Sequence, residues 1–79
     1  MWVRAQITEG LFPSERAVEL DTTEGKIQVF VSGSQINEKL RALRVSLLDE
    51  DDRFVLVNLP SLGGGKVAKM DRGQVISVA

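Results

Sequence analysis

The sequence predicts a mainly β fold: a small, partly open barrel of five or six strands, SH3-like or OB-like, with one short helix or helical turn. Three observations support this prediction. Short apolar segments with a period of two recur along the chain. Turn-forming residues separate these segments at intervals of roughly ten residues. The 79 residues, finally, leave room for a single domain, residues 1–79.

The first three strands are expected at residues 2–10, 16–21 and 26–32. In the first of them Val3, Ala5 and Ile7 share one face, and Arg4 lies on the other. A turn at residues 22–25 ends in Gly25, which suits a positive φ. These segments predict an N-terminal β-meander.

The period changes after residue 32. Ile36, Leu40 and Leu43 are spaced i, i+4, i+7, and serines precede them, so the pattern predicts a short helix or helical turn over residues 35–41. A 3₁₀ turn leading straight into a longer strand fits these residues nearly as well.

Two apolar runs, residues 43–48 and 54–59, flank an acidic turn at residues 49–53. This pattern predicts a β-hairpin with buried strands and a solvated loop. The second run is apolar at both parities except for Asn58, so we expect it to be buried on both faces in the middle of a sheet. The hairpin is therefore the element that the other strands must cover.

A loop is expected at residues 60–65, followed by a weaker strand signal in residues 67–79 that is best at residues 75–78. The pattern indicates no internal repeat and no linker.

The side-chain inventory argues against catalysis. The chain contains no Cys, His or Tyr, so it offers no thiolate or imidazole ligand and no histidine base for a serine nucleophile. We therefore expect a non-enzymatic protein without cofactor or metal. The formal charge of −1 does not favour a broad nucleic-acid footprint.

A domain of this size buries a small core, and without disulfide or metal a partner subunit is the remaining way to stabilise it. We therefore expect a homo-oligomer or a complex with another protein. No apolar run reaches the ~18 residues of a membrane helix, and the N-terminus lacks a signal-peptide pattern, so we expect a soluble cytoplasmic protein without membrane association.

Two motifs invite a ligand interpretation. The four carboxylates of residues 49–52 suit a hard cation, but they lack EF-hand spacing, and a charged turn between two apolar strands favours solubility instead. The run 63–66 resembles part of a phosphate loop, but Pro60 and Val67 stand where a Walker loop needs Gly and Ser or Thr. A flexible connector is the favoured interpretation of this second motif.

The candidate binding residues are Trp2, Arg4, Phe12, Arg44 and Lys66. Trp2 beside Arg4 suits contact with a base or a protein, although Trp2 folded back as a lid on the core is the favoured interpretation. The leading functional hypothesis is protein–protein interaction or self-assembly, because Phe30, Leu48, Val55 and Val57 fall at nominally outward positions. The alternative hypothesis is nucleic-acid binding by Trp2, Arg4, Arg44 and Lys66 on one side of the barrel.

Overall fold

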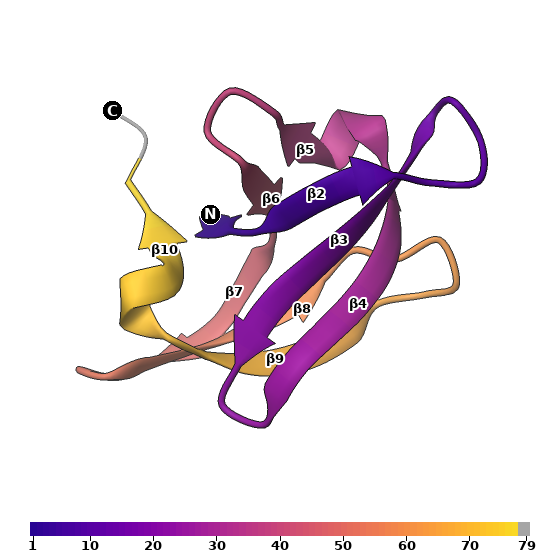
Figure 1. Ribbon diagram of the computed structural model, residues 1–79. Coiled ribbons are helices and arrows are strands. Elements are labelled where there is room, and N and C mark those ends of the chain that lie inside the picture. Colours follow the sequence, from indigo (N-terminus) through magenta and orange to yellow (C-terminus); the bar gives the residue numbers. More distant parts are fainter. Residues whose placement is uncertain (78–79) are drawn as a thin grey trace.

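The computed structural model describes residues 1–77, which form short antiparallel strands and two single-turn 3₁₀ helices, with no α-helix in that range (Figure 1). The elements in chain order are β1 (Trp2–Arg4), β2 (Gln6–Glu9), β3 (Glu15–Thr22), β4 (Gly25–Ser32), η1 (Gly33–Gln35), β5 (Ile36–Asn37), β6 (Ala42–Arg44), β7 (Ser46–Glu50), β8 (Phe54–Leu59), β9 (Lys66–Asp71), η2 (Arg72–Gln74) and β10 (Val75–Ile76). The predicted mainly β class is confirmed.

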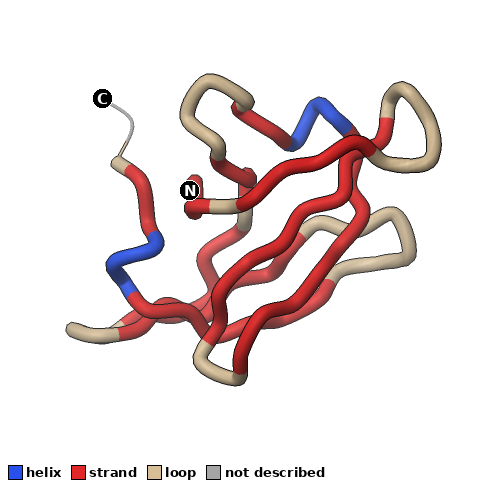
Figure 2. The backbone as a smooth tube through the Cα atoms, in the orientation of Figure 1, coloured by secondary structure: helices blue, strands red, loops and turns tan. Residues whose placement is uncertain are grey.

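The strands form three antiparallel sheets, none of which closes into a barrel, so the predicted barrel is not confirmed. The four-stranded sheet has the order β10-β1-β6-β5, and the three-stranded sheets have the orders β2-β3-β4 and β7-β8-β9. One buried residue separates β1 from β2, and another separates β6 from β7: Ala5 and Val45. The chain therefore bends at these two points from the four-stranded sheet into each three-stranded sheet (Figure 2).

The two halves of the chain repeat the same strand pairing. Residues 15–32 pair in the same register as residues 54–71, with a constant offset of 39 positions. The matched pairs include Glu15–Ser32 with Phe54–Asp71, Ala17–Phe30 with Leu56–Lys69, and Leu20–Ile27 with Leu59–Lys66. The chain is therefore a tandem repeat of a first half, residues 1–37, and a second half, residues 42–76.

The four-stranded sheet relates the two halves by an internal twofold. Val3 and Leu43 occupy equivalent positions and are each other's pairing partner. Exchanging the halves converts the pair Trp2–Arg44 into Ala42–Arg4, which is also present. The expectation that the chain contains no internal repeat was wrong.

Turn and capping chemistry repeats along with the strand register. Gly25 and Gly64 are equivalent, and their φ angles are 108° and 115°. The matched hydrogen bonds are Glu24 N–H to Thr22 Oγ1 with Gly63 N–H to Ser61 Oγ, and Ser34 N–H to Ser32 Oγ with Gly73 N–H to Asp71 Oδ1. Because different residue types meet the same local requirement, the repeat is visible in the geometry and faint in the residue identities.

One hydrophobic core receives equivalent side chains from both halves. Its fully buried members include two matched pairs from the hairpins, Val18 with Val57 and Leu20 with Leu59. Each hairpin turn also reaches the edge strand of the other half: Thr23 N–H donates to Lys69 O and Leu62 N–H to Phe30 O, both at 2.9 Å. The two halves are thus packed and hydrogen-bonded as one unit.

The strands expected at residues 16–21 and 26–32 are confirmed, and so is the hairpin of residues 43–60, whose Ala42–Arg44 segment belongs to the four-stranded sheet. The strand expected at residues 2–10 is interrupted at Ala5 and is divided between two sheets. The helix expected over residues 35–41 is wrong. A 3₁₀ turn leads straight into the short strand β5, because the side chain of Ser32 caps it and the chain then pairs with β6. The C-terminal signal corresponds to β9, η2 and β10, and residue 78 lies outside the described residues.

β8 lies in the middle of its sheet but is not deeply buried on both faces. Val55, Val57 and Leu59 are fully buried, whereas the alternate residues are half-buried. Val55 and Val57 were therefore wrongly expected to point outward, since they line the core face. Leu47 belongs to the apolar run 43–48, which was expected to form a buried strand. It is 41% exposed because β7 is an edge strand with a register shift between Leu47 and Asp49.

Within residues 1–77, no helix has the length and apolar character needed to cross a bilayer.

Candidate interaction surface

The predicted neighbours Trp2 and Arg44 are brought together. They face each other across β1 and β6, and the Arg44 guanidinium lies 5.5 Å from the centre of the Trp2 ring. This is a cation–π contact, and Trp2 is half-buried beneath it. One face of the indole is therefore already occupied by an arginine.

Arg4 and Lys66 are not gathered with Trp2. Arg4 lines a small hollow with Glu19, Asp21 and Lys26. The two carboxylates lie 3.5 Å and 3.3 Å from the Lys26 ammonium, and the hydrogen bond that this ammonium donates to Asp21 is the main cause that raises the pKa of Lys26. Lys66 lies in a separate hollow beside Thr22, Thr23 and Leu56.

Phe12 is 65% exposed and belongs to a group of apolar side chains at one end of the β3–β4 hairpin. We call this group the apolar end. Its members and their exposed fractions are Leu11 (85%), Phe12 (65%), Phe30 (42%) and Leu62 (59%). Single exposed apolar residues are ordinary on protein surfaces, but a group at one end is a candidate contact surface.

Backbone hydrogen bonds bring together the segments that carry Phe12, Phe30 and Leu62. Leu62 N–H donates to Phe30 O, which places the β8–β9 loop against β4. Glu15 N–H donates to Phe12 O. Glu15 also pairs across β3 and β4 with Ser32, which lies two residues after Phe30 in β4. Figure 1 shows the β2–β3 and β8–β9 loops on the same side of the molecule, away from the turn between β7 and β8.

An open hollow of about 650 Å³ lies beside the apolar end. It extends from Trp2 to Pro13 and Ser14, the residues that follow Phe12. Arg16 and Glu38 form an ion pair of 3.1 Å in its lining, and Arg16 also donates to Pro13 O at 2.8 Å. These bonds fasten the β2–β3 loop to the turn after β5, so the loop that carries Leu11 and Phe12 is anchored at its base.

The position equivalent to the apolar end is charged. Lys69 stands where the first half has Phe30, and Thr23 stands where the second half has Leu62. The loop that carries Leu11 and Phe12 has its counterpart in the acidic turn between β7 and β8. We call the group formed by Thr23, Asp51, Arg53, Lys69 and Arg72 the charged end.

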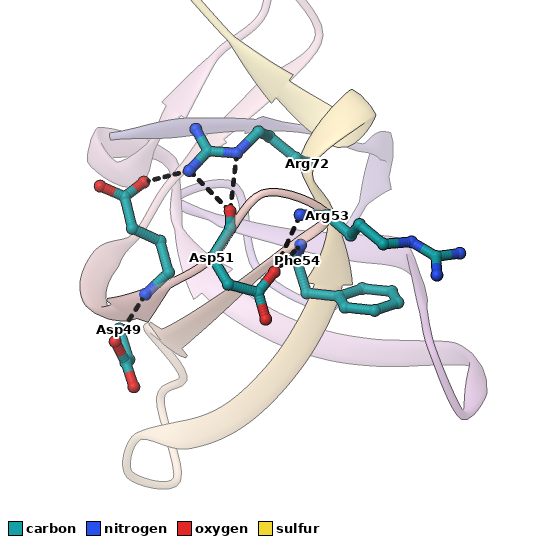
Figure 3. Close-up of polar contacts among 6 residues, drawn as sticks. Asp49, Asp51, Arg53, Phe54 and Arg72 are labelled. Carbon is teal, nitrogen blue, oxygen red and sulfur yellow. Dashed lines mark hydrogen bonds and ion pairs between the residues drawn. The ribbon is translucent and has the colours of Figure 1, made fainter.

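The carboxylates of the charged end are used within the turn (Figure 3). Asp51 Oδ1 accepts hydrogen bonds from the backbone N–H groups of Arg53 and Phe54, both at 2.8 Å. These two bonds lower the pKa of Asp51. Arg72 donates to Glu50 Oε2 at 2.8 Å and to the backbone carbonyl of Asp51.

The Phe54 ring makes cation–π contacts with two side chains at this end. The Lys69 ammonium is 4.6 Å from the centre of its ring, and the Arg53 guanidinium is 5.5 Å from it. Among residues 1–77, no three acidic side chains converge in a way that could hold a metal ion. The acidic turn therefore has a structural explanation: its side chains cap backbone amides and hold Arg72.

The glycine-rich loop is likewise explained by its turn. Gly63 N–H donates to Ser61 Oγ and Gly64 N–H to Ser61 O, so two of its amides are engaged internally. Gly64 supplies the positive φ that the turn requires, as Gly25 does in the first half.

Of the candidate binding residues, the structure joins Trp2 with Arg44, and it places Phe12 in the apolar end with Phe30. Sequence analysis did not single out Leu62, although a large apolar residue beside three glycines is unusual enough to have been a signal. Comparison of the chain with protein-family models, with curated proteins and with solved structures found no match.

Proposed function

We propose that this chain is a non-enzymatic, cytoplasmic protein-interaction module that self-associates through the apolar end. The observation that carries the proposal is the exposure of Leu11, Phe12, Phe30 and Leu62 at one end of the β3–β4 hairpin. Removing such side chains from water favours association by about 25 cal/mol per Å² of apolar surface. The partner is a second copy of the chain.

The position of Phe30 on an edge strand also supports the apolar end as the contact surface. β4 is the edge strand of its sheet, and Phe30 lies on it. An edge with few charges and an exposed aromatic side chain invites pairing, whereas lysine on an edge opposes it. The lysine of β4, Lys26, lies at the other end of the strand from Phe30 and is paired with Glu19 and Asp21. β9, the equivalent edge, presents Lys66 and Lys69. β4, in the first half, is therefore the edge strand that is better suited to pair with another chain.

The internal repeat supplies the variants that test this proposal. Phe30→Lys and Leu62→Thr place at the apolar end the residues found at the equivalent positions of the charged end, where the same backbone accommodates them. We expect the double variant to remain folded and to lower the association constant by roughly tenfold or more. Sedimentation velocity across a hundred-fold dilution measures this change.

Val67→Gln is the matched control. Val67 is 57% exposed but lies outside the apolar end, and Gln28 occupies its equivalent position. This variant should associate as the wild type does. A wild type that stays monomeric at every concentration, or a double variant that associates unchanged, would contradict the proposal.

Nucleic-acid binding is the less supported alternative. Stacking on a base needs a free aromatic face, and one face of Trp2 is covered by Arg44. Arg4 and Lys66 line hollows of their own, and the carboxylates of Glu19 and Asp21 line the same hollow as Arg4. Trp fluorescence that is quenched by an oligonucleotide at low salt and recovers at high salt would favour this alternative.

We also propose that the three sheets together act as a partly open barrel of the SH3-like or OB-like kind. Support comes from the backbone hydrogen bonds Thr23 to Lys69 and Leu62 to Phe30, which link the two three-stranded sheets at their edges. Slow amide hydrogen exchange at Thr23 and Leu62 is the expected result, and exchange as fast as in exposed loops would contradict it.

A further inference from the structure

The two halves of the chain are interleaved in the four-stranded sheet. Its order, β10-β1-β6-β5, alternates strands from the second half and the first half. Both neighbours of β1 come from the second half, and both neighbours of β6 come from the first. Neither half can complete this sheet alone.

Three backbone hydrogen bonds outside the ladders also join one half to the other. Val45 N–H donates to Met1 O at 2.8 Å, beside the pairing of β1 with β6. Thr23 and Leu62 each donate to an edge strand of the opposite half. All of these contacts between halves could form equally well between two chains.

A single short turn, residues 38–41, connects the halves between β5 and β6. Arg41 in this turn has a φ of 51°, and among residues 1–77 it is the one non-glycine residue with a positive φ. A non-glycine residue is strained in that region, and the strain is released when the chain extends. Short strained hinges favour exchange of elements between copies.

We propose that two copies of the chain exchange halves, so that residues 1–37 of one copy complete the fold with residues 42–76 of the other. The turn at residues 38–41 is the hinge. When it opens, β5 and β6 of one chain form a continuous extended segment, and this segment pairs antiparallel with the same segment of the second chain. The exchanged dimer reuses every contact between the halves of the monomer. This inference does not depend on the apolar end, which stays exposed in both forms.

Hinge variants provide the first test. Arg41 is exposed, so substitutions there leave the core unchanged. Arg41→Gly removes the strain of the closed turn, and Arg41→Val increases it, because a β-branched residue disfavours positive φ. After refolding at millimolar protein, light scattering coupled to size exclusion should show fewer dimers for Arg41→Gly and more for Arg41→Val. The two dissociation constants should differ by roughly tenfold.

Deletion of residues 38–41 extends this test, because β5 and β6 can then no longer turn back on each other. The expected product is a dimer with the circular dichroism of the wild type. A folded monomer lacking residues 38–41 would overturn the proposal.

A disulfide test decides the matter if the deletion variant does not fold. Arg4 and Ala42 are partners across β1 and β6, at a Cα separation that antiparallel pairing keeps within disulfide range. Chains carrying Arg4→Cys and chains carrying Ala42→Cys are refolded together and oxidised. An exchanged dimer yields a disulfide between two chains, whereas copies docked by their surfaces do not.

A single chain with both cysteines is the geometric control, since it should form an internal disulfide. Internal oxidation without any cross-linked product from the mixed chains would overturn the exchange. Adding Phe30→Lys and Leu62→Thr to the mixed chains should leave the cross-link yield unchanged. Loss of the cross-link in that background would contradict the independence of the exchange from the apolar end.

Discussion

The apolar end and the charged end occupy equivalent positions in the two halves and carry opposite chemistry. The backbone pairing is the same at both, yet Phe30 corresponds to Lys69, and Leu62 to Thr23. In the core the same comparison gives Val18 with Val57. These equivalent positions are thus alike at the centre of the shared core, and they differ at the two exposed ends.

This contrast teaches that the exposed apolar side chains of the first half are not a requirement of the fold. The charged end shows that a lysine and a threonine satisfy the same backbone positions. A hydrophobic residue at such a place costs solubility, so a contact surface is the physical role that suits it. The predictions below test the equivalence of the halves first and their difference afterwards.

The largest effect is expected from truncating equivalent core leucines. Leu20 and Leu59 are both almost fully buried. Leu20→Ala and Leu59→Ala should each lower the free energy of unfolding by about 2–5 kcal/mol, because each removes buried methyl groups and leaves a cavity. Urea unfolding measures both. A large loss for one variant with little loss for the other would break the equivalence of the halves.

A smaller effect, again of equal size in the two halves, is expected at the hairpin turns. Gly25→Ala and Gly64→Ala should each cost about 1–3 kcal/mol, because an added side chain strains a backbone with φ of 108° or 115°. No other atom lies near either added Cβ, so the cost is conformational. Gly63→Ala, at a position equivalent to Glu24, is the control and should unfold as the wild type does.

The reciprocal surface change should affect association more than stability. Lys69→Phe gives the charged end the aromatic residue of the apolar end. It removes a cation from the Phe54 ring and an edge-strand lysine, so we expect stronger self-association. Sedimentation velocity measures this change, and association no stronger than that of the wild type would contradict the expected role of the edge lysine.

The smallest effect concerns acid stability at the β7–β8 turn. The N–H groups of Arg53 and Phe54 hold the pKa of Asp51 below its ordinary value of 3.8. The stability from these bonds is therefore present above that value and is lost as the pH falls through the lower folded pKa. Asp51→Asn should reduce the acid sensitivity of unfolding in this range. Identical pH profiles for both proteins would contradict the role of Asp51.

Much of the strand pattern could be predicted because the period-two alternation of Val3, Ala5, Val18 and Leu20 reflects burial directly. The repeat could not, because Ser32 and Asp71 cap equivalent 3₁₀ turns with different side chains. The helix expected over residues 35–41 did not form, although Ile36 and Leu40 have a helical spacing. Ile36 pairs with Leu43 in a strand instead, and Leu40 lies in the turn that follows.

The candidate surface was predicted only in part. Phe12 and Phe30 stood out as apolar residues in a loop or at an outward position. Their neighbour Leu62 comes from the other half of the chain, and a hydrogen bond between distant segments brings it to Phe30. Neither local periodicity nor composition contains that information.

The most direct test of the central claim is a dilution series followed residue by residue with amide NMR spectra. If the apolar end is the contact surface, chemical shifts should change with concentration at Leu11, Phe12, Phe30 and Leu62. The equivalent residues Thr23 and Lys69 should stay constant. Shifts that move equally at both ends, or at neither, would contradict the claim.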